Sequence, residues 1–202
     1  MSNAILAPPL SPIKAYEPQR YRWTCDQFHQ FGDRGLFDGR RAMLIDGEIL
    51  TMPMAAPPHV TSLHLVAKFL DRTFPDFYVR NQSALNVGTE NDPGPDLAVV
   101  PGSIRDYATR QATTAILVVE IADSSLSFDR GPKSNLYAAA NVQEYWVLDV
   151  NGRQLFIYRE PVADVDAPRG WRYTTMQTFA ETERVSPLVA PQASVLLSEL
   201  LP

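Results

Sequence analysis

The sequence predicts one domain of the α/β or α+β class. The chain has 202 residues, 45% of them hydrophobic, which is enough to build a substantial core. Short apolar runs typical of strands alternate with segments of helical periodicity. Neither an internal repeat nor a linker divides the chain after a proline-containing N-terminus. We therefore expect an extended arm at residues 1–20 and a single domain at residues 21–202.

The first elements are indicated by capping and turn residues. Thr24, with Gln27 three positions later, predicts a capping box for a short helix that ends near Gly32. Asp46-Gly47 between apolar residues predicts a hairpin over residues 43–50.

A longer helix is predicted next, followed by strands. Pro57-Pro58 introduces a helix whose apolar residues keep helical spacing through about Thr73. A strand with a polar middle is expected over Phe77–Val87, and a turn over Asn91–Pro95.

The middle of the chain contains two apolar runs that read as central strands, Pro95–Val100 and Ile116–Ala122. The polar segment between them, residues 101–115, is expected to be a loop. A helix is predicted over Pro132–Ala140 because proline suits a first helical turn. Asn141 fits the left-handed residue that closes a helix.

The C-terminal part reads mainly as strands. Asn151-Gly152 predicts a type I′ hairpin between strands at 145–150 and 153–159. After a loop at 162–170 we expect a strand over Trp171–Phe179 and a short helix around Ser198.

Composition excludes several function classes. The net charge of −5 argues against a broadly basic surface for nucleic acid, so any attraction for phosphate must be local. A single cysteine, Cys25, excludes an intramolecular disulfide and a multi-cysteine zinc site. We see no signal peptide and no apolar run near the roughly 18 residues of a membrane span, so we expect a cytoplasmic protein. Phosphate-binding glycine loops, Gly-x-Ser-x-Gly elbows and His-Glu-x-x-His helices are absent from the sequence.

The chemistry-bearing residues gather between residues 95 and 133. Each central strand carries one carboxylate, Asp96 or Glu120, and Lys133 follows at the start of the next predicted helix. A carboxylate inside an apolar run is unfavourable unless it is paired or binds a ligand. Two strand carboxylates with an ammonium nearby could hold a hard divalent cation and steady an anionic substrate.

Several motifs, taken in order, resemble the Uma-two family of restriction-endonuclease-like proteins, within the PD-(D/E)xK nuclease superfamily. The resemblance covers roughly residues 20–200 and rests on the following segments: Ile45-Asp46-Gly47-Glu48, Pro58-His59, Pro95-Asp96, Glu120-Ile121-Ala122-Asp123-Ser124-Ser125, Asp129-Arg130-Gly131-Pro132-Lys133, Leu136-Tyr137-Ala138-Ala139-Ala140-Asn141-Val142 and Glu144-Tyr145-Trp146-Val147-Leu148-Asp149. It implies a mixed β-sheet flanked by helices and a Mg²⁺-dependent phosphodiesterase site.

The resemblance assigns roles residue by residue. Asp96 resembles the aspartate of the family motif and Glu120 its second acid. Ala122 stands where the lysine is expected, and Lys133 on the following helix takes that place. Two departures are Asn141, where relatives usually have glycine, and Met43, where they often have an acid.

Each residue also has a structural alternative. Asp96 could cap a turn, Glu120 could form a buried ion pair, and Lys133 could be a solvated helix residue or pair with Asp129 four positions earlier. We place Asp96, Glu120 and the backbone carbonyl of Ile121 as metal ligands, and Asp96, Glu120 and Lys133 as catalytic residues.

Four further residues are candidates for support of the site. Glu48 could instead be a solvated hairpin residue, and His59 a packing or capping histidine. Asp129 is expected to cap the helix that carries Lys133, with Tyr137 one turn beyond the lysine.

Two functional hypotheses follow. The first is a Mg²⁺- or Mn²⁺-dependent endonuclease acting on DNA. The second is a catalytically silent nucleic-acid-binding or assembly module that retains the fold. A homodimer is also expected, paired through the edge of the Asn151-Gly152 hairpin.

Overall fold

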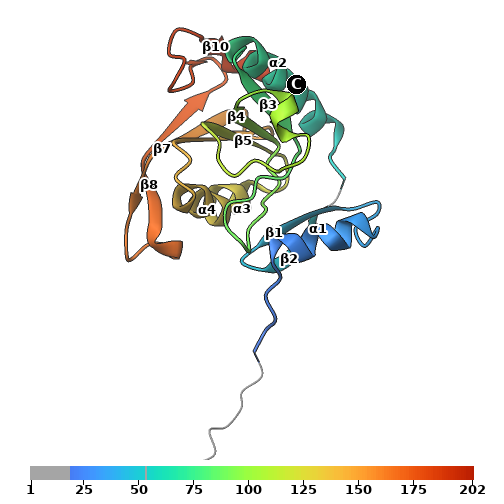
Figure 1. The fold of residues 1–202 in the computed structure, drawn as a ribbon. Coiled ribbons are helices and arrows are strands. Elements are labelled where there is room, and N and C mark those ends of the chain that lie inside the picture. The colour runs from blue at the N-terminus through green and yellow to red at the C-terminus, as the bar shows by residue number, and fades with distance from the viewer. Residues whose placement is uncertain (1–18, 53) are drawn as a thin grey trace, which may run out of the picture.

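A central mixed sheet organises the fold. The computed structural model describes residues 19–52 and 54–202 (Figure 1). Six strands pair in the order β3-β4-β5-β6-β7-β8, and only β5 and β6 run parallel. Their bounds are Phe77–Asn81, Leu97–Pro101, Leu117–Ala122, Glu144–Asp149, Gln154–Ala163 and Trp171–Ala180. The expected mixed sheet, with its two apolar central strands, is confirmed.

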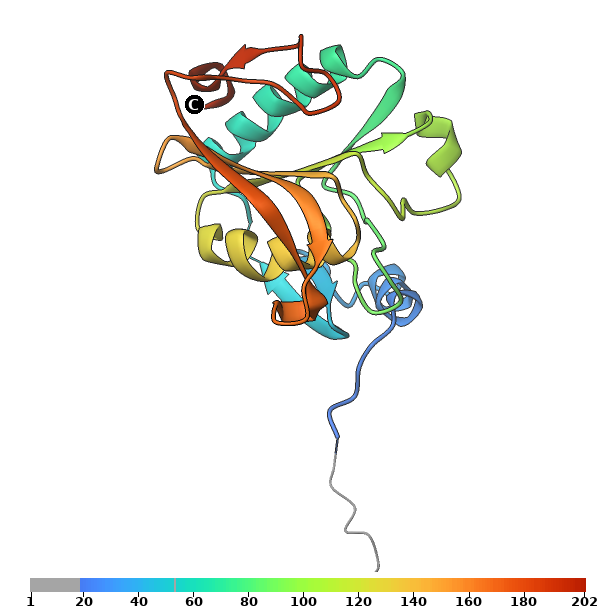
Figure 2. The ribbon, with the colours of Figure 1, turned by 90° about the vertical axis from the view of Figure 1, so that its left-hand side faces the viewer.

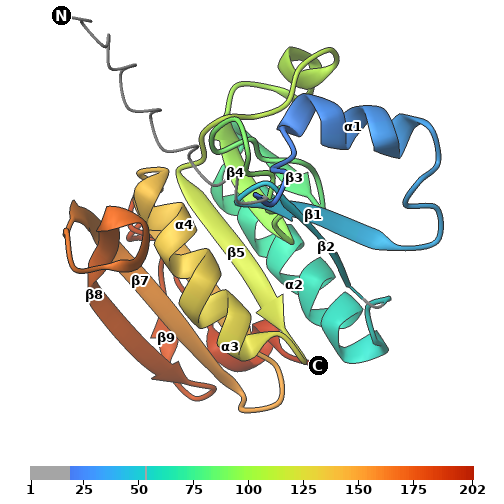
Figure 3. The ribbon, with the colours of Figure 1, turned by 90° about the horizontal axis from the view of Figure 1, so that it is seen from below.

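Helices cover both faces of the sheet. Helix α2 (Pro57–Thr73) packs on one face, where Leu63, Val66 and Leu70 join the apolar core. The parallel crossover between β5 and β6 covers the other face with three consecutive helical segments (Figure 3). These segments are α3 (Leu126–Phe128), the π-helical turn η2 (Asp129–Lys133) and α4 (Ser134–Ala139). Alternate residues of the central strands supply the two cores, as strand geometry requires.

The N-terminal part forms a small unit beside the sheet (Figure 1). It consists of α1 (Cys25–Asp33) and the hairpin of β1 (Arg41–Ile45) and β2 (Glu48–Met52). Thr24 and Gln27 form the predicted capping box, and Asp46 with Gly47 makes the predicted turn. Apart from residues 19 and 20, the expected N-terminal arm lies outside the described residues.

The remaining elements are short. They are the 3-10 helices η1 (Ile104–Tyr107), η3 (Pro168–Gly170) and η4 (Leu197–Leu200), and the strands β9 (Arg184–Val185) and β10 (Val195–Leu196). The short helix predicted around Ser198 is η4. No helix in the described part of the chain is long and apolar enough to span a membrane.

The helix around Lys133 begins earlier than predicted. Pro132 lies inside a continuous helical stretch rather than in its first turn, and the backbone around it adopts a π-helical turn. Proline has no backbone N–H to donate, and a π turn can absorb the irregularity. Asp129 is therefore an interior helical residue and not the expected helix cap. Asn141, at φ 57°, closes α4 as predicted.

Three other boundaries differ from the prediction. The strand expected over Phe77–Val87 ends at Asn81, because Gln82 has a positive φ of 44° that breaks the extended backbone. The loop after β6 has its positive φ at Arg153 instead of at Asn151-Gly152, so the turn is not type I′. Strand β7 continues to Ala163, with Glu160 at a positive φ.

Candidate functional site

The carboxylates of Asp96 and Glu120 come together because of the register of two strands. β4 and β5 pair antiparallel with Leu97 opposite Val119, so the ladder places Asp96 opposite Glu120 at its end. The Ile121 amide donates a 2.9 Å hydrogen bond to Asp96 Oδ2. A side chain on one strand is thus fixed to the backbone of the next.

Glu120 is held by residues of the crossover helix. Its Oε1 lies 2.9 Å from Lys133 Nζ and accepts a 2.8 Å hydrogen bond from the Tyr137 hydroxyl. Lys133 Nζ also lies 3.2 Å from Asp129 Oδ1. The Glu120 and Lys133 side chains are each only 2% exposed, so Lys133 is not a solvated helix residue. The buried ion pair considered for Glu120 and the pairing of Lys133 with Asp129 are both present.

Asp96 is held by an arginine and a histidine from other elements. Arg41 Nη1, on β1, donates a 2.8 Å hydrogen bond to Asp96 Oδ1. His59 Nε2, in the first turn of α2, lies 3.2 Å from the same oxygen. Gln82 donates a longer hydrogen bond, 3.3 Å, to that oxygen. Asp96 thus joins β1, α2 and the end of β3 and does not act as a simple turn cap.

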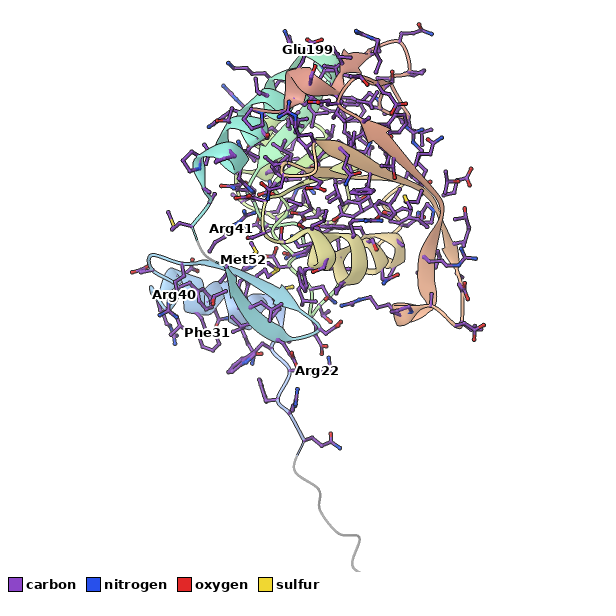
Figure 4. The ribbon with its side chains drawn as sticks, turned by 180° about the vertical axis from the view of Figure 1, so that it is seen from behind. Arg22, Phe31, Arg40, Arg41, Met52 and Glu199 are labelled. Atoms are coloured by element: carbon purple, nitrogen blue, oxygen red, sulfur yellow. The ribbon has the colours of Figure 1, made fainter. Side chains whose placement is uncertain are left out.

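These groups line one cavity of about 180 Å³. Arg41, His59, Asp96, Glu120 and Lys133 all contribute to its wall. Ile121, Asp123, Ser124 and Ser125 line it from the end of β5 and the segment that follows. Met52, Met54, Ala55 and Ala56 complete the wall between β2 and α2. Arg41 and Met52 lie on the side of the hairpin that faces the sheet (Figure 4). The site is therefore buried at its carboxylates yet open to small molecules.

Burial and neighbouring charges shift the pKa values of the two acids in opposite directions. Burial, followed by the nearby charges of Asp129 and Asp96, raises the pKa of Glu120 to about 7, against the opposing effect of Lys133. Burial would also raise the pKa of Asp96, but His59, Arg41 and the Ile121 amide hold it well below its usual range. A divergence of this kind between paired acids is typical of functional sites.

The pKa values of Lys133 and Tyr137, which both contact Glu120, are also raised. Burial alone would lower the pKa of Lys133, but the charges of Glu120 and Asp129 raise it, so the ammonium stays protonated. Burial and the Glu120 charge raise the pKa of Tyr137 well above its usual value, so its hydroxyl remains a donor.

The structure brings together most, but not all, of the residues singled out from the sequence. Asp96, Glu120, Lys133, Asp129, Tyr137 and His59 form one connected group. Glu48 lies outside it, half-exposed and paired with Arg20. Arg41 was missed, because nothing in the local sequence indicates a contact with a residue 55 positions away.

Met43 occupies an apolar position next to the site. It is 2% exposed and packs with Ile45 and Leu136. This packing joins the β1–β2 hairpin to α4. Met43 supplies no oxygen ligand at that position.

The donor set fits a hard divalent cation. Asp96 and Glu120 offer carboxylate oxygens at one cavity, and Ile121, which follows Glu120 on β5, lines the same cavity. Oxygen donors of this kind suit Mg²⁺ or Mn²⁺ better than zinc. Among residues 19–52 and 54–202, no three His, Cys, Asp or Glu side chains are arranged as a metal-binding group, so a ligand sphere would need backbone oxygen or water besides the two acids.

Comparison with known proteins agrees with this fold. The model of the Uma2 family, described as "Putative restriction endonuclease", matches residues 25–198. A solved structure described as "a putative nuclease belonging to DUF820" from Anabaena variabilis ATCC 29413 superimposes with a TM-score of 0.69 at 17% sequence identity. The superposition covers 88% of this chain and 96% of the other. No curated protein matches the chain.

Proposed function

The chain belongs to the Uma2 family, and from that premise we propose that it is a metal-dependent endonuclease that hydrolyses phosphodiester bonds of DNA. The observation that carries the proposal is the convergence of Asp96, Glu120 and Lys133 on one cavity. Two acids and an ammonium at an accessible cavity can hold a cation and oppose the charge of a phosphate.

Each residue has a role in this proposal. Asp96, Glu120 and the Ile121 carbonyl would hold Mg²⁺ or Mn²⁺, and the ion would polarise the phosphate and activate water. Lys133 would stabilise the negative charge that develops on the phosphate or orient the attacking water. His59 and Arg41 position Asp96, while Tyr137 positions Glu120 through its hydroxyl.

The second candidate is a catalytically silent nucleic-acid-binding or assembly module. It is favoured by the charge balance of the cluster, where Arg41 already pairs with Asp96 and Lys133 with Glu120. The apolar, buried Met43 also favours this candidate, because the family resemblance leads us to expect an acid at that position.

Cleavage of supercoiled plasmid separates the two candidates. We expect the purified protein to nick DNA in Mn²⁺ or Mg²⁺, and Glu120→Gln to abolish nicking while circular dichroism shows a retained fold. Glu181→Gln is the matched control, because Glu181 is a partly exposed acid paired with Arg153 away from the cavity. Wild-type protein without metal-dependent cleavage, or a Glu120→Gln variant with full activity, would overturn the nuclease assignment.

We also propose a cytoplasmic homodimer built from one domain, residues 21–202. The hairpin at Asn151-Gly152, which was expected to offer an edge, consists of β6 and β7. Neither strand is a free edge, because β6 also pairs with β5 and β7 also pairs with β8. The sheet ends instead at β3 and β8, which are the edges left for a partner strand. Light scattering distinguishes a 22.6 kDa monomer from a particle of twice that mass.

A further inference from the structure

A second cavity lies beyond the β3 edge of the sheet. It has a volume of about 670 Å³ and lies between β3, the segment after it, and η1. Figure 2 shows η1 projecting past that end of the sheet. Tyr78, Arg80, Ser83, Tyr107 and Gln111 are among the lining residues, and none of them lines the cavity at Asp96.

Arg80 is the unusual residue of this second cavity. It is only 7% exposed, and its Nη2 donates to the Ala84 carbonyl and to Gln111 Oε1. Its Nε is buried and has no hydrogen-bond partner among the described residues. A guanidinium has five N–H donors, so the two bonds to Ala84 and Gln111 leave most of them without a protein acceptor in the described chain.

The charge of Arg80 is not neutralised by an acid. Within residues 19–52 and 54–202, no carboxylate comes within ion-pair distance of it, although Arg41, Lys133 and Arg159 all pair with buried acids. The rings of Tyr78 and Tyr107 lie 5.9 and 5.1 Å from its guanidinium carbon and compensate part of the desolvation. A buried cation without an anion is unfavourable unless a ligand supplies one.

The surroundings favour an anionic ligand. Arg105 on η1 lines the same cavity from an exposed position and adds a second positive charge. The acid next to it, Asp106, turns its Oδ2 to the amide and hydroxyl of Ser103. The local charge is thus positive on a molecule whose net charge is −5.

The two cavities are linked along one strand and its continuation. Arg80 pairs with Ala98 on β4, and two residues later Gln82 contacts Asp96 by both its amide nitrogen and its side chain. Ala98 follows Asp96 by two residues, which is at most about 6.6 Å of extended backbone, and Arg80 lies opposite Ala98 on the neighbouring strand. A nucleic-acid strand with one phosphate at the first cavity can therefore continue over the β3 edge toward Arg80.

We propose that the Arg80 cavity binds a phosphate of the nucleic-acid strand that flanks the bond at the first cavity, with Arg80 as the anchoring cation and Arg105 at the rim. The inference rests on the proposed function for the identity of the ligand. It assigns Arg80 to binding and positioning of the substrate, away from the reacting atoms.

The test measures binding without cleavage. Fluorescence anisotropy of a labelled single-stranded and a labelled double-stranded oligonucleotide, in EDTA and at several salt concentrations, compares wild type, Arg80→Gln and Arg105→Gln. Arg172→Gln is the control that removes the same charge from β8, at the opposite edge of the sheet. Thermal unfolding of each variant identifies loss of the fold, and the exposed Arg105→Gln keeps the test informative if Arg80→Gln unfolds.

We expect Arg80→Gln to weaken binding about tenfold, as loss of a hydrogen-bonded charge contact does, and Arg105→Gln to weaken it by a smaller factor. Each lost phosphate contact should lower the slope of log affinity against log salt by about 0.7 to 0.9. An unchanged affinity and salt slope in a folded Arg80→Gln variant would overturn the inference, as would an equal effect of Arg172→Gln. Because these measurements need no metal, weakened binding without cleavage by the wild type would reject the nuclease reaction and keep the Arg80 site.

Discussion

Lys133 is the residue on which the buried cluster depends. Its ammonium faces two carboxylates, Glu120 at 2.9 Å and Asp129 at 3.2 Å, and all three side chains are about 2% exposed. Loss of one partner of a buried ion pair leaves an uncompensated charge, which destabilises a protein by about 3–5 kcal/mol. We therefore expect Lys133→Met to lower the free energy of unfolding by this amount, measured by urea denaturation, and to abolish cleavage.

A double variant distinguishes the contribution of the Lys133 charge from that of its side-chain packing. If the loss comes from unpaired carboxylates, Lys133→Met combined with Glu120→Gln should be more stable than Lys133→Met alone, with a coupling of about 0.5–3 kcal/mol. Additive losses in the double variant would mean that Lys133 contributes through its aliphatic stem, and the ion-pair argument would be wrong.

Cys25 offers a separate prediction, on chemical reactivity. Burial, followed by the charge of Asp92, raises the pKa of its thiol, and its sulfur lies 3.4 Å from the Gly88 carbonyl. Because the thiolate is the reactive form, we expect an aromatic disulfide reagent to modify folded protein at least about tenfold more slowly than protein in concentrated urea. Equal rates in the two states, followed by absorbance, would show that the α1 unit opens readily.

At the scale of elements, the prediction succeeded where local pattern decides structure. The apolar runs around Leu97–Val100 and Leu117–Ala122 fix the strands, and strand pairing then brings Asp96 to Glu120. Arg41 and the cavity at Arg80 could not be predicted in this way, because each depends on contacts between segments far apart in the chain. The π turn at Pro132 was missed for another reason, since the prediction relied on the preference of proline for the first turn of a helix.

The end of α4 gives a prediction at this scale. Asn141 has a φ of 57° and leads the chain from α4 into β6. A side chain with a Cβ and no local hydrogen bond is about 1–2 kcal/mol less stable in this conformation. We expect Asn141→Ala to lower the free energy of unfolding by about 1 kcal/mol and Asn141→Gly to leave it nearly unchanged. Equal effects of the two variants in urea denaturation would contradict the backbone explanation.

At the scale of the whole molecule, the site is assembled from three parts of the chain. The β1–β2 hairpin supplies Arg41, α2 supplies His59, and the sheet with its crossover helix supplies the acids and the lysine. The hairpin is tied to the body by paired backbone hydrogen bonds between Leu44 and Asp92. The cavity therefore forms only when the hairpin, α2 and the sheet are folded together. For this reason no single sequence motif could predict it.

Metal binding should therefore stabilise the whole fold. A cation at 100 times its dissociation constant adds about 2.7 kcal/mol to the native state, which raises the melting temperature of a chain of this size by roughly 5–10 °C. We expect this rise with Mn²⁺ in wild type and in the control Glu181→Gln, and its loss in the double variant Asp96→Asn with Glu120→Gln. Scanning calorimetry without DNA makes the measurement independent of catalysis. If the double variant kept the full rise, the cation would bind elsewhere, and the two acids would be a structural cluster paired with Arg41 and Lys133.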